Sequence, residues 1–150
     1  MTTIFERLTK DHEKQRQLAK KIMGTSGDSA DRRSLWDQFK PEAVAHANAE
    51  EQTLYAAMME KPDGQEKARH SVSEHKEAAD VIKELDGMDM GTGGWIQKFE
   101  KLKDELEHHM EEEENETFQK AKKVLDSEKA DQLADDFEKR KKRELAESPS

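Results

Sequence analysis

The sequence predicts an all-α fold, an up-and-down antiparallel four-helix bundle with an additional C-terminal helix. Apolar residues recur at the three- and four-residue spacing of a helix face in five long stretches. Charged residues make up 41% of the chain and hydrophobic residues 32%, a mixture typical of helices with narrow apolar stripes and wet outer faces. The breaks between the stretches are short, which favours antiparallel neighbours.

The first two helices are delimited by caps and helix breakers. The first is expected from Thr3, whose hydroxyl can cap it, to Met23, because Gly24 follows. The second is expected over about residues 29–60. Pro41 lies inside this stretch and lacks the N–H that an inner helical turn needs, so we expect a kink or a restart of the helix there.

The third and fourth helices are expected over about residues 65–85 and 95–125, separated by a glycine-rich loop. A chain of 150 residues corresponds to about one domain. We therefore expect residues 1–125 to form the bundle, residues 127–146 to pack on it as a fifth helix, and residues 147–150 to form a tail.

Histidine and glutamate interrupt the apolar stripes at one level of the predicted bundle. On the second helix His46 and Glu50 stand in line with apolar residues, and on the fourth helix His109 and Glu113 do the same. The first helix contributes His12 at the same level. The inward positions expected on the third helix are Ala68, Val72, His75, Ala79 and Ile82. Each of four helices thus points one histidine at a common layer of the core.

A constant offset relates two halves of the chain. His12 and His75 are 63 residues apart, and the same offset separates the two His-x-x-x-Glu pairs. The strings DHEKQRQLAKKI and EHKEAADVIKEL also align at this offset. The sequence therefore indicates two copies of a helical hairpin, packed about an approximate two-fold axis through the histidine layer.

This arrangement suits a pair of metal ions. A histidine and a glutamate four residues apart lie one above the other on a helix, so both can reach one ion, or the carboxylate can bridge two. Nitrogen and oxygen donors without sulfur suit iron, manganese or zinc, and open sites in a bundle core suit redox iron best. We predict two iron ions with an oxo or hydroxo bridge and bridging carboxylates from Glu50 and Glu113. The predicted metal ligands are His12, His46, Glu50, His75, His109 and Glu113.

The alternative is a set of hydrogen-bonded core histidines with no metal. A single histidine on an apolar stripe is more often of that kind. Four histidines and two glutamates at one level are harder to explain in this way, because a buried carboxylate without a partner costs several kcal/mol. The pattern therefore favours the metal centre.

The sequence resembles the hemerythrin-like domains, also called HHE cation-binding domains. The resemblance is carried by His12, His46-Ala-Asn-Ala-Glu50, His75 and His109-Met-Glu-Glu-Glu113, in the order H…HxxxE…H…HxxxE, over about residues 1–125. It implies a non-haem di-iron centre in a four-helix bundle.

The chain departs from the oxygen-carrying members of that family. They have a fifth histidine one turn before the third-helix ligand, where this chain has Ser71, and an aspartate where it has Glu114. The symmetric set of four histidines and two glutamates is more similar to the di-iron domain of the iron–sulfur cluster repair proteins. Those proteins carry a cysteine-bearing segment, and this chain has no cysteine. Neither oxygen transport nor cluster repair is therefore implied.

Further residues near the layer have alternative interpretations. Glu51 and Glu114 are candidate acceptors for the ring N–H groups of the ligand histidines, and the alternative is a solvated acidic face. His70 and His108 are expected to face solvent; an extra ligand is the alternative for His70. Tyr55 is expected to be a core aromatic residue rather than part of an access route.

Composition limits the other classes of function. Without cysteine the chain has no disulfide, thiolate metal site or cysteine nucleophile. A net charge of −9 argues against general nucleic-acid binding. The basic run 139–143 is expected to be a solvent-exposed helix face, with contact to an acidic partner as the alternative. No long apolar run and no signal peptide are apparent, so we expect a cytoplasmic protein that does not enter a membrane.

The predicted function is binding of, or reaction with, O2, NO or peroxide at the di-iron centre, in sensing or a stress response. The alternatives are an iron storage or donor protein and a helical interaction protein with a structural metal site. A structural site normally saturates its metal with protein ligands, so the open positions favour the first class. A small diatomic gas or peroxide is therefore the expected ligand. Neither a protein partner nor an enzymatic reaction follows from the sequence.

Overall fold

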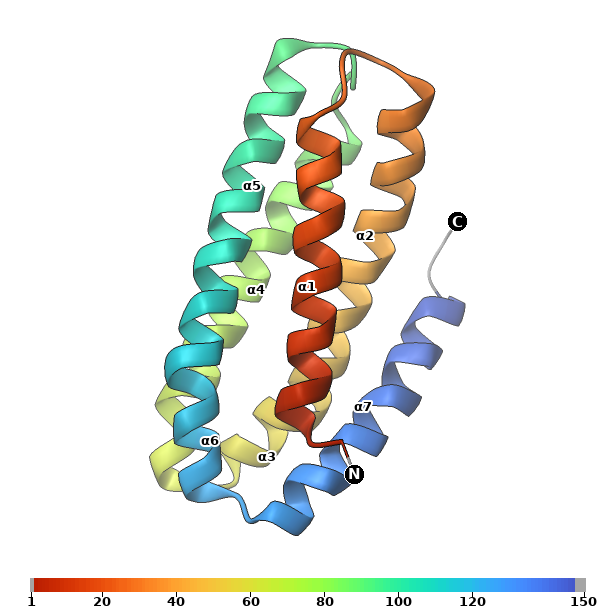
Figure 1. The fold of residues 1–150 in the computed structure, drawn as a ribbon. Helices are drawn as coiled ribbons and strands as arrows, with labels where there is room; N and C mark the ends of the chain where they lie inside the picture. The colour runs from red at the N-terminus through yellow and green to blue at the C-terminus, as the bar shows by residue number, and fades with distance from the viewer. Residues whose placement is uncertain (1, 148–150) are drawn as a thin grey trace.

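Five long helices make up most of the molecule (Figure 1). The computed structural model describes residues 2–147, and within this range the regular structure is entirely helical. The long helices are α1 (Ile4–Met23), α2 (Ala30–Glu50), α4 (Gln65–Asp86), α5 (Gly93–Glu112) and α7 (Ser127–Glu147), and a short turn, η2 (Pro62–Gly64), precedes α4. Helices α1, α2, α4 and α5 run side by side in alternating directions, and α7 packs against α1 and α2.

The predicted fold class, an up-and-down bundle with an additional C-terminal helix, is confirmed. Of the tail expected at residues 147–150, Glu147 is the last residue of α7 and residues 148–150 lie outside the described range. None of the helices within residues 2–147 is both long and apolar enough to cross a membrane.

The helices begin at side-chain caps. Thr3 accepts a hydrogen bond from the backbone N–H of Glu6 at 3.2 Å, and the Glu6 carboxylate accepts one from the backbone N–H of Thr3 at 3.2 Å. This reciprocal pair satisfies two N–H groups that the first helical turn leaves without partners. Ser29 caps α2 and Thr92 caps α5, and each side chain accepts one backbone hydrogen bond. The predicted helix starts are therefore close to those observed.

The restart expected at Pro41 is wrong, because α2 runs from Ala30 to Glu50 with Pro41 inside it. Proline removes the hydrogen bond that the carbonyl of Asp37 would otherwise accept. Asp37 is exposed, so water can bond to that carbonyl instead. The proline is thus tolerated on the wet side of the helix.

A wider helical turn, not predicted from the sequence, follows each His-x-x-x-Glu pair. The segments concerned are η1 (Glu51–Tyr55), which joins α2 to α3 (Ala56–Met59), and η3 (Glu113–Thr117), which joins α5 to α6 (Phe118–Val124). In a π turn the backbone bonds reach five residues back instead of four, and such turns are frequent at functional sites. The fifth residue after Glu50 and after Glu113, Tyr55 and Phe118 respectively, therefore returns to the inward face, and both are buried.

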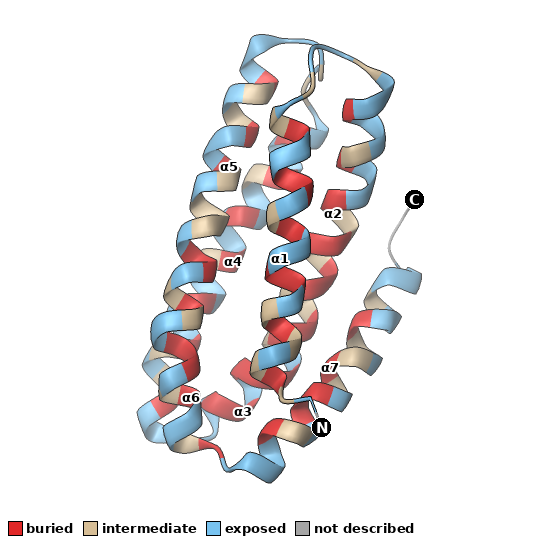
Figure 2. Cartoon of the chain, viewed as in Figure 1, coloured by how far each residue is buried: buried red, intermediate tan, exposed pale blue. Residues whose placement is uncertain are grey.

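The core has two apolar clusters, and the histidine layer lies between them. Figure 2 shows buried positions along the length of the bundle helices. One cluster contains Trp36, Trp95 and Phe99, with the ring centroids of the two tryptophans 5.5 Å apart. The other contains Leu54 and Phe137, and so includes α7. The apolar packing at both ends holds the four helices at the distances that the layer between them needs.

The stripe predicted on the third helix is partly wrong. Ala68, His75 and Ile82 are buried as expected, but Val72 is 39% exposed and Ala79 is also exposed. Ser71 and Ala78 are buried in their place. Both sets of positions lie near the face of His75, because residues three and four apart are neighbours on a helix. The helical period alone therefore does not decide between Ser71 with Ala78 and Val72 with Ala79.

Helix α7 buries part of the basic run. Lys141 is 6% exposed, and its Nζ lies 3.0 Å from Asp11 and 2.5 Å from Oε1 of Glu42. The expectation of a wholly solvent-exposed run over residues 139–143 is therefore wrong at Lys141. The reason is that Lys141 follows Phe137 by four residues and shares the face of α7 that packs on α1 and α2.

We predict that Lys141→Met destabilises the metal-free protein by on the order of 3 kcal/mol, because it leaves two buried carboxylates without their shared cation. The Lys142→Met variant removes the same chemical group from an exposed neighbouring position and should change the free energy of unfolding by less than about 0.5 kcal/mol. Urea denaturation of the two variants measures the difference. Equal midpoints would show that the buried ammonium contributes nothing to folding.

Candidate metal centre

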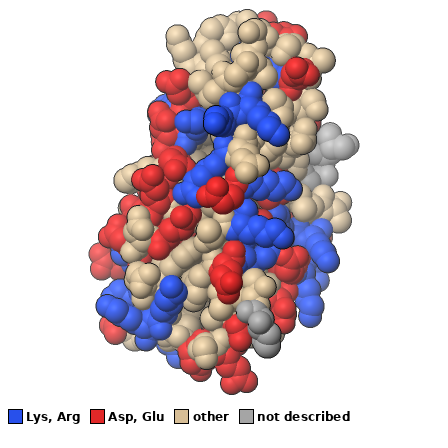
Figure 3. Space-filling view, viewed as in Figure 1, with Lys and Arg blue, Asp and Glu red and all other residues tan. Residues whose placement is uncertain are grey.

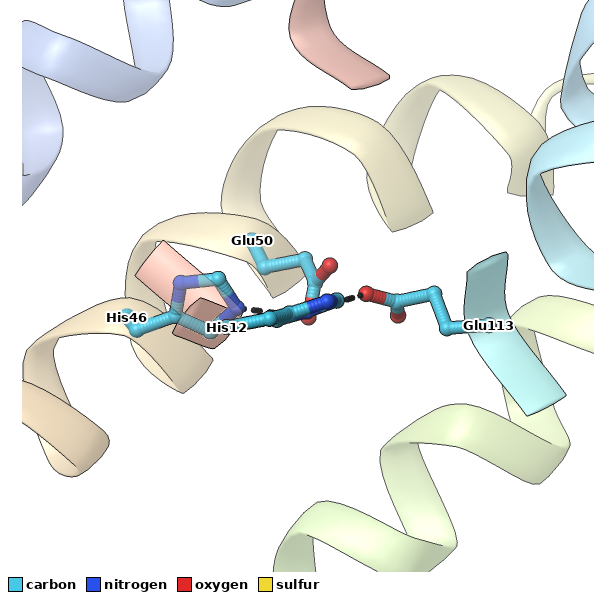
Figure 4. Close-up of side chains that lie close together, drawn as sticks. All are labelled: His12, His46, Glu50 and Glu113. Carbon is cyan, nitrogen blue, oxygen red and sulfur yellow. Dashed lines mark ion pairs between the residues drawn. The ribbon is translucent and has the colours of Figure 1, made fainter. Parts of the chain in front are cut away.

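The six predicted ligands meet at one level of the bundle (Figure 4 shows four of them). They come from four helices and the start of η3. All are buried, with exposed fractions of 8% or less: His12, His46, Glu50, His75, His109 and Glu113. The backbone therefore brings together from distant parts of the sequence all the side chains that the pattern singled out.

The imidazole Nε2 atoms point toward the two carboxylates. His75 Nε2 lies 3.2 Å from Oε1 of Glu50, and His12 Nε2 lies 3.1 Å from Oε1 of Glu113. Within each His-x-x-x-Glu pair the corresponding separation is 3.6 Å. These donors form two groups in which the ligand atoms lie within 4.8 Å of one another, one with four residues and one with three, and Glu50 belongs to both. The arrangement suits two neighbouring cations that share a carboxylate.

Some buried oxygen and nitrogen atoms of the donor set lack hydrogen-bond donors among the described residues, which also fits a site for metal ions. Oε2 of Glu50 and Oε1 of Glu113 are buried and accept no hydrogen bond from residues 2–147. The Nε2 atoms of His75 and His109 face each other at 3.1 Å. Buried carboxylate oxygens without donors are costly, and cations between these groups would satisfy them. The residues therefore fit the cation centre that the sequence predicted.

Protons take part in the balance of charge in this layer. Burial opposes protonation of His46, but the charge of Glu50 and the hydrogen bond to Asp11 raise the pKa of His46 to about 10. Burial likewise opposes protonation of His109, yet its bond to Glu74 and the charge of Glu113 raise its pKa to about 9. Metal binding needs neutral imidazole and must therefore release these protons.

The two glutamates are not equivalent in this respect. Burial raises the pKa of Glu113, and the neighbouring charge of Glu50 raises it further. Burial also opposes ionisation of Glu50, but the charge of His46 and hydrogen bonds from the histidines bring its pKa well below the ordinary value. Without a cation between them, Glu113 therefore takes up a proton more readily than Glu50 does.

Outer carboxylates orient three of the four imidazoles. The Nδ1 atom of His46 lies 2.8 Å from Oδ2 of Asp11, and Nδ1 of His109 lies 2.8 Å from Oε1 of Glu74. An Nδ1–H donated to a carboxylate leaves Nε2 free to bind a cation and makes it more basic. Such contacts hold three of the four rings in the orientation that a preformed donor set needs.

Asp11 and Glu74 were missed in the sequence, although a signal for them was present. Each directly precedes a predicted ligand, His12 and His75, in the aligned strings DHEK and EHKE. The two acidic residues are themselves 63 residues apart. The internal repeat therefore covers the outer carboxylates as well as the ligands.

Of the two candidate acceptors, Glu114 contacts a ring nitrogen of the layer and Glu51 does not. His12 Nδ1 lies 2.7 Å from Oε2 of Glu114, whereas His75 Nδ1 is 3.9 Å from Oε1 of Glu51 and has no hydrogen-bond partner within residues 2–147. Arg16 also contacts Glu114, at 3.1 Å, and helps to hold it in place. Alanine stands where the repeat would put a second arginine, so nothing similar holds Glu51.

Tyr55 adds a hydroxyl to the centre. It is 1% exposed, as expected of a core aromatic residue, but its O–H group lies 3.0 Å from Oε1 of Glu50 and contacts Oε2 of Glu113. The repeat places Phe118 at the equivalent position, where its ring packs parallel to His12 at 6.3 Å. The two halves of the centre therefore differ, and only one has a phenol beside the carboxylates.

A largely apolar cavity of about 270 Å³ opens between α2 and α4 and reaches all four histidines. Its wall includes Ala43, Val44 and Ile82. Val72 and Ala79, the two residues of α4 that are exposed against expectation, also line it. The cavity gives a small neutral molecule a route from solvent to the layer.

The fold and the donor set define a helical-bundle protein with a candidate histidine–glutamate cation centre. The model of the hemerythrin family, described as the hemerythrin HHE cation binding domain, matches residues 3–121, and the chain belongs to this family. Membership confirms the resemblance seen in the sequence.

Two individual proteins are similar to the chain. An uncharacterized hemerythrin-like protein of Schizosaccharomyces pombe is 27% identical over 145 residues, which cover 95% of this chain and 70% of that protein. The crystal structure of a hemerythrin HHE cation binding domain-containing protein from Mycobacterium kansasii has a TM-score of 0.87 at 21% sequence identity. The match covers 97% of this chain and 89% of the Mycobacterium kansasii chain. This second likeness supports the fold.

We predict opposite pH dependences for folding and for metal binding. Because the folded pKa values of His46 and His109 are raised from 6.5 to about 10 and about 9, their contribution to stability is complete below pH 6.5. It is lost as the pH rises through these values. Metal affinity should rise over the same range, since fewer protons have to be displaced.

Denaturation of the metal-free protein and competition with a chelator, both between pH 6 and pH 10, measure the two slopes. The control is Glu111→Gln, a change at an exposed residue outside both groups of candidate ligands, which should leave both slopes unchanged. Slopes of the same sign would contradict the prediction.

Proposed function

We propose that the chain is a non-haem di-iron protein whose centre binds or reacts with O2, NO or peroxide. In this proposal two iron ions are held by the four histidines of the layer and bridged by Glu50 and Glu113. Iron in such a site supplies reversible redox chemistry. The observation that carries the proposal is the combination of a buried nitrogen and oxygen donor set with an apolar opening that leads to it.

The number of donors supports an open centre. Six side chains offer four nitrogens and two carboxylates for two ions, so iron with its usual coordination keeps positions for an added ligand. A purely structural site is normally closed by protein ligands and has no need of a cavity. The apolar wall beside the histidines favours a small ligand with little charge.

Tyr55 supports reaction as well as binding. Its O–H group is the one phenolic donor among the residues that touch the two carboxylates, and it is fully buried with them. Burial and the two nearby carboxylates raise its pKa well above the ordinary value, so it stays protonated. It can therefore donate a hydrogen bond to a ligand that arrives beside the carboxylates.

Iron storage or delivery is the alternative, and it shares the ligand set. It differs in what the protein does with O2, NO and peroxide, so it makes different predictions for the reduced protein. A sensing or stress-response role belongs to the first proposal and rests on the same reactivity.

The purified protein is expected to contain about two iron ions per chain and, when oxidised, a near-ultraviolet absorption band. The double variant Glu50→Ala/Glu113→Ala should lose both features, because it removes the two carboxylates that neutralise and join the ions. Metal analysis and absorption spectroscopy test this. Zero or one tightly bound metal in the parent protein would rule out the dinuclear centre.

Tyr55→Phe should keep the iron content and slow the reaction of the reduced protein with peroxide by at least about tenfold, because a hydrogen-bond donor is lost while the ring remains. Phenylalanine already occupies the equivalent position of the repeat, so the substitution suits the fold. Stopped-flow mixing with O2, NO and peroxide measures the rates. If none of the three reagents changes the spectrum of the parent protein, iron handling replaces the proposed function.

A further inference from the structure

A second group of metal-ligating side chains lies on the outer side of the bundle, where α4 and α5 are neighbours. Nε2 of His70 lies 2.8 Å from Oε1 of Glu112 and 3.6 Å from Oε1 of Glu74. Nε2 of His108 lies 3.4 Å from the other oxygen of Glu112. His70 and His108 are exposed and the two glutamates half-buried, so a dissolved cation can reach all of them.

We propose that His70, Glu74 and Glu112, with His108 beside them, form a surface site for a divalent cation that supplies the histidine layer. The proposal rests on the layer's being a cation centre and is independent of what that centre reacts with. The cation would be a transition metal ion such as Fe²⁺, Mn²⁺ or Zn²⁺, since imidazole and carboxylate are the ligands these ions share.

The geometry of the group suits one ion. The candidate ligand atoms of His70, Glu74 and Glu112 lie within 4.8 Å of one another. Metal bonds to imidazole and carboxylate are about 2.0–2.2 Å long, so an ion at the centre can reach all three after small side-chain movements. Three protein ligands without a closed shell favour weak and reversible binding, which suits a site that passes its ion on.

Glu74 connects this group to the core. The same Oε1 atom that is 3.6 Å from His70 lies 2.8 Å from Nδ1 of His109, a ligand of the layer. One carboxylate therefore separates the surface group from the centre. An ion bound outside would lie next to a residue that already orients the inner donor.

A groove beside Glu74 leads inward and is acidic. This cavity of about 310 Å³ between α4 and α5 reaches His75 and His109. Its wall carries four carboxylates: Glu74, Glu77, Asp104 and Glu105. Figure 3 shows acidic side chains along the edge of the molecule that α5 forms. A groove lined by carboxylates attracts cations and raises their local concentration, whereas the opening between α2 and α4 is largely apolar.

The internal repeat shows that this group is particular to one half of the molecule. At the offset of 63 residues, His70 corresponds to Arg7 and Glu74 to Asp11, while His108 and Glu112 correspond to alanines, Ala45 and Ala49. Helix α7 covers that first face, with Arg7 bonded to Glu138 of α7. The face formed by α4 and α5 has no covering helix among the described residues. Three of its four positions, His70, His108 and Glu112, carry a possible metal ligand where the first face does not.

The test is a calorimetric titration of Zn²⁺ into protein whose core metals have first been loaded and counted. One additional equivalent is expected. His70→Ala and Glu112→Gln should weaken its binding by roughly tenfold or more, whereas Glu111→Gln, a change at the exposed neighbouring residue, should not. Circular dichroism checks that each variant is folded.

Loading of the core provides the second measurement. The metal-free variants His70→Ala and Glu112→Gln should take up Fe²⁺ several-fold more slowly than Glu111→Gln and the parent, and reach the same final metal content. Absence of an additional equivalent, or the same loss in Glu111→Gln as in Glu112→Gln, would overturn the surface site. Unchanged loading rates would overturn its role in supply. A core that holds fewer than two metals would instead count against the di-iron proposal.

Discussion

Six ionisable side chains buried at one level of an apolar bundle are the constraint on which the rest of the structure depends. Four imidazoles and two carboxylates lose most of their contact with water there, and each needs a compensating charge or hydrogen bond. Outer carboxylates supply part of it, protons supply part in the absence of a cation, and metal ions complete it. The two apolar clusters on either side keep the helices in register while these groups meet.

The two hairpins of the repeat meet this demand unequally. In the first half, Asp11 is backed by Arg7 and by Lys141 of α7, so His46 is oriented by a buried and fully paired carboxylate. In the second half, Glu74 faces an exposed histidine, and the ring nitrogen of His75 that points away from the layer has no partner in the described part of the chain. Within residues 2–147 no helix covers this half, which is therefore both more accessible and more loosely held, and it is the half beside Tyr55.

Two openings of different chemical character lead to the histidine layer, one on each side of α4. On its α2 side an apolar wall leads to the histidines, which suits small neutral molecules. On its α5 side carboxylates and imidazoles line the way, which suits cations. The proposed function and the proposed surface site would therefore use separate routes, one for small ligands and one for cations. Two adjacent residues of α4 differ in this respect, since Val72 lines the apolar opening and Ser71 is buried in the core.

Helical periodicity and capping alone predict the four-helix bundle, its loops and the common layer of histidines and glutamates, because i to i+4 spacing is a local geometric property of each helix. The same repeat contains Asp11 and Glu74. Other features depend on contacts between segments far apart in the chain: the burial of Lys141 under α7, the bond of Glu114 to His12, and the lack of one at Glu51. The π turns that carry Tyr55 inward also escape a pattern based on the α-helical period, since one wider turn shifts every later residue to another face.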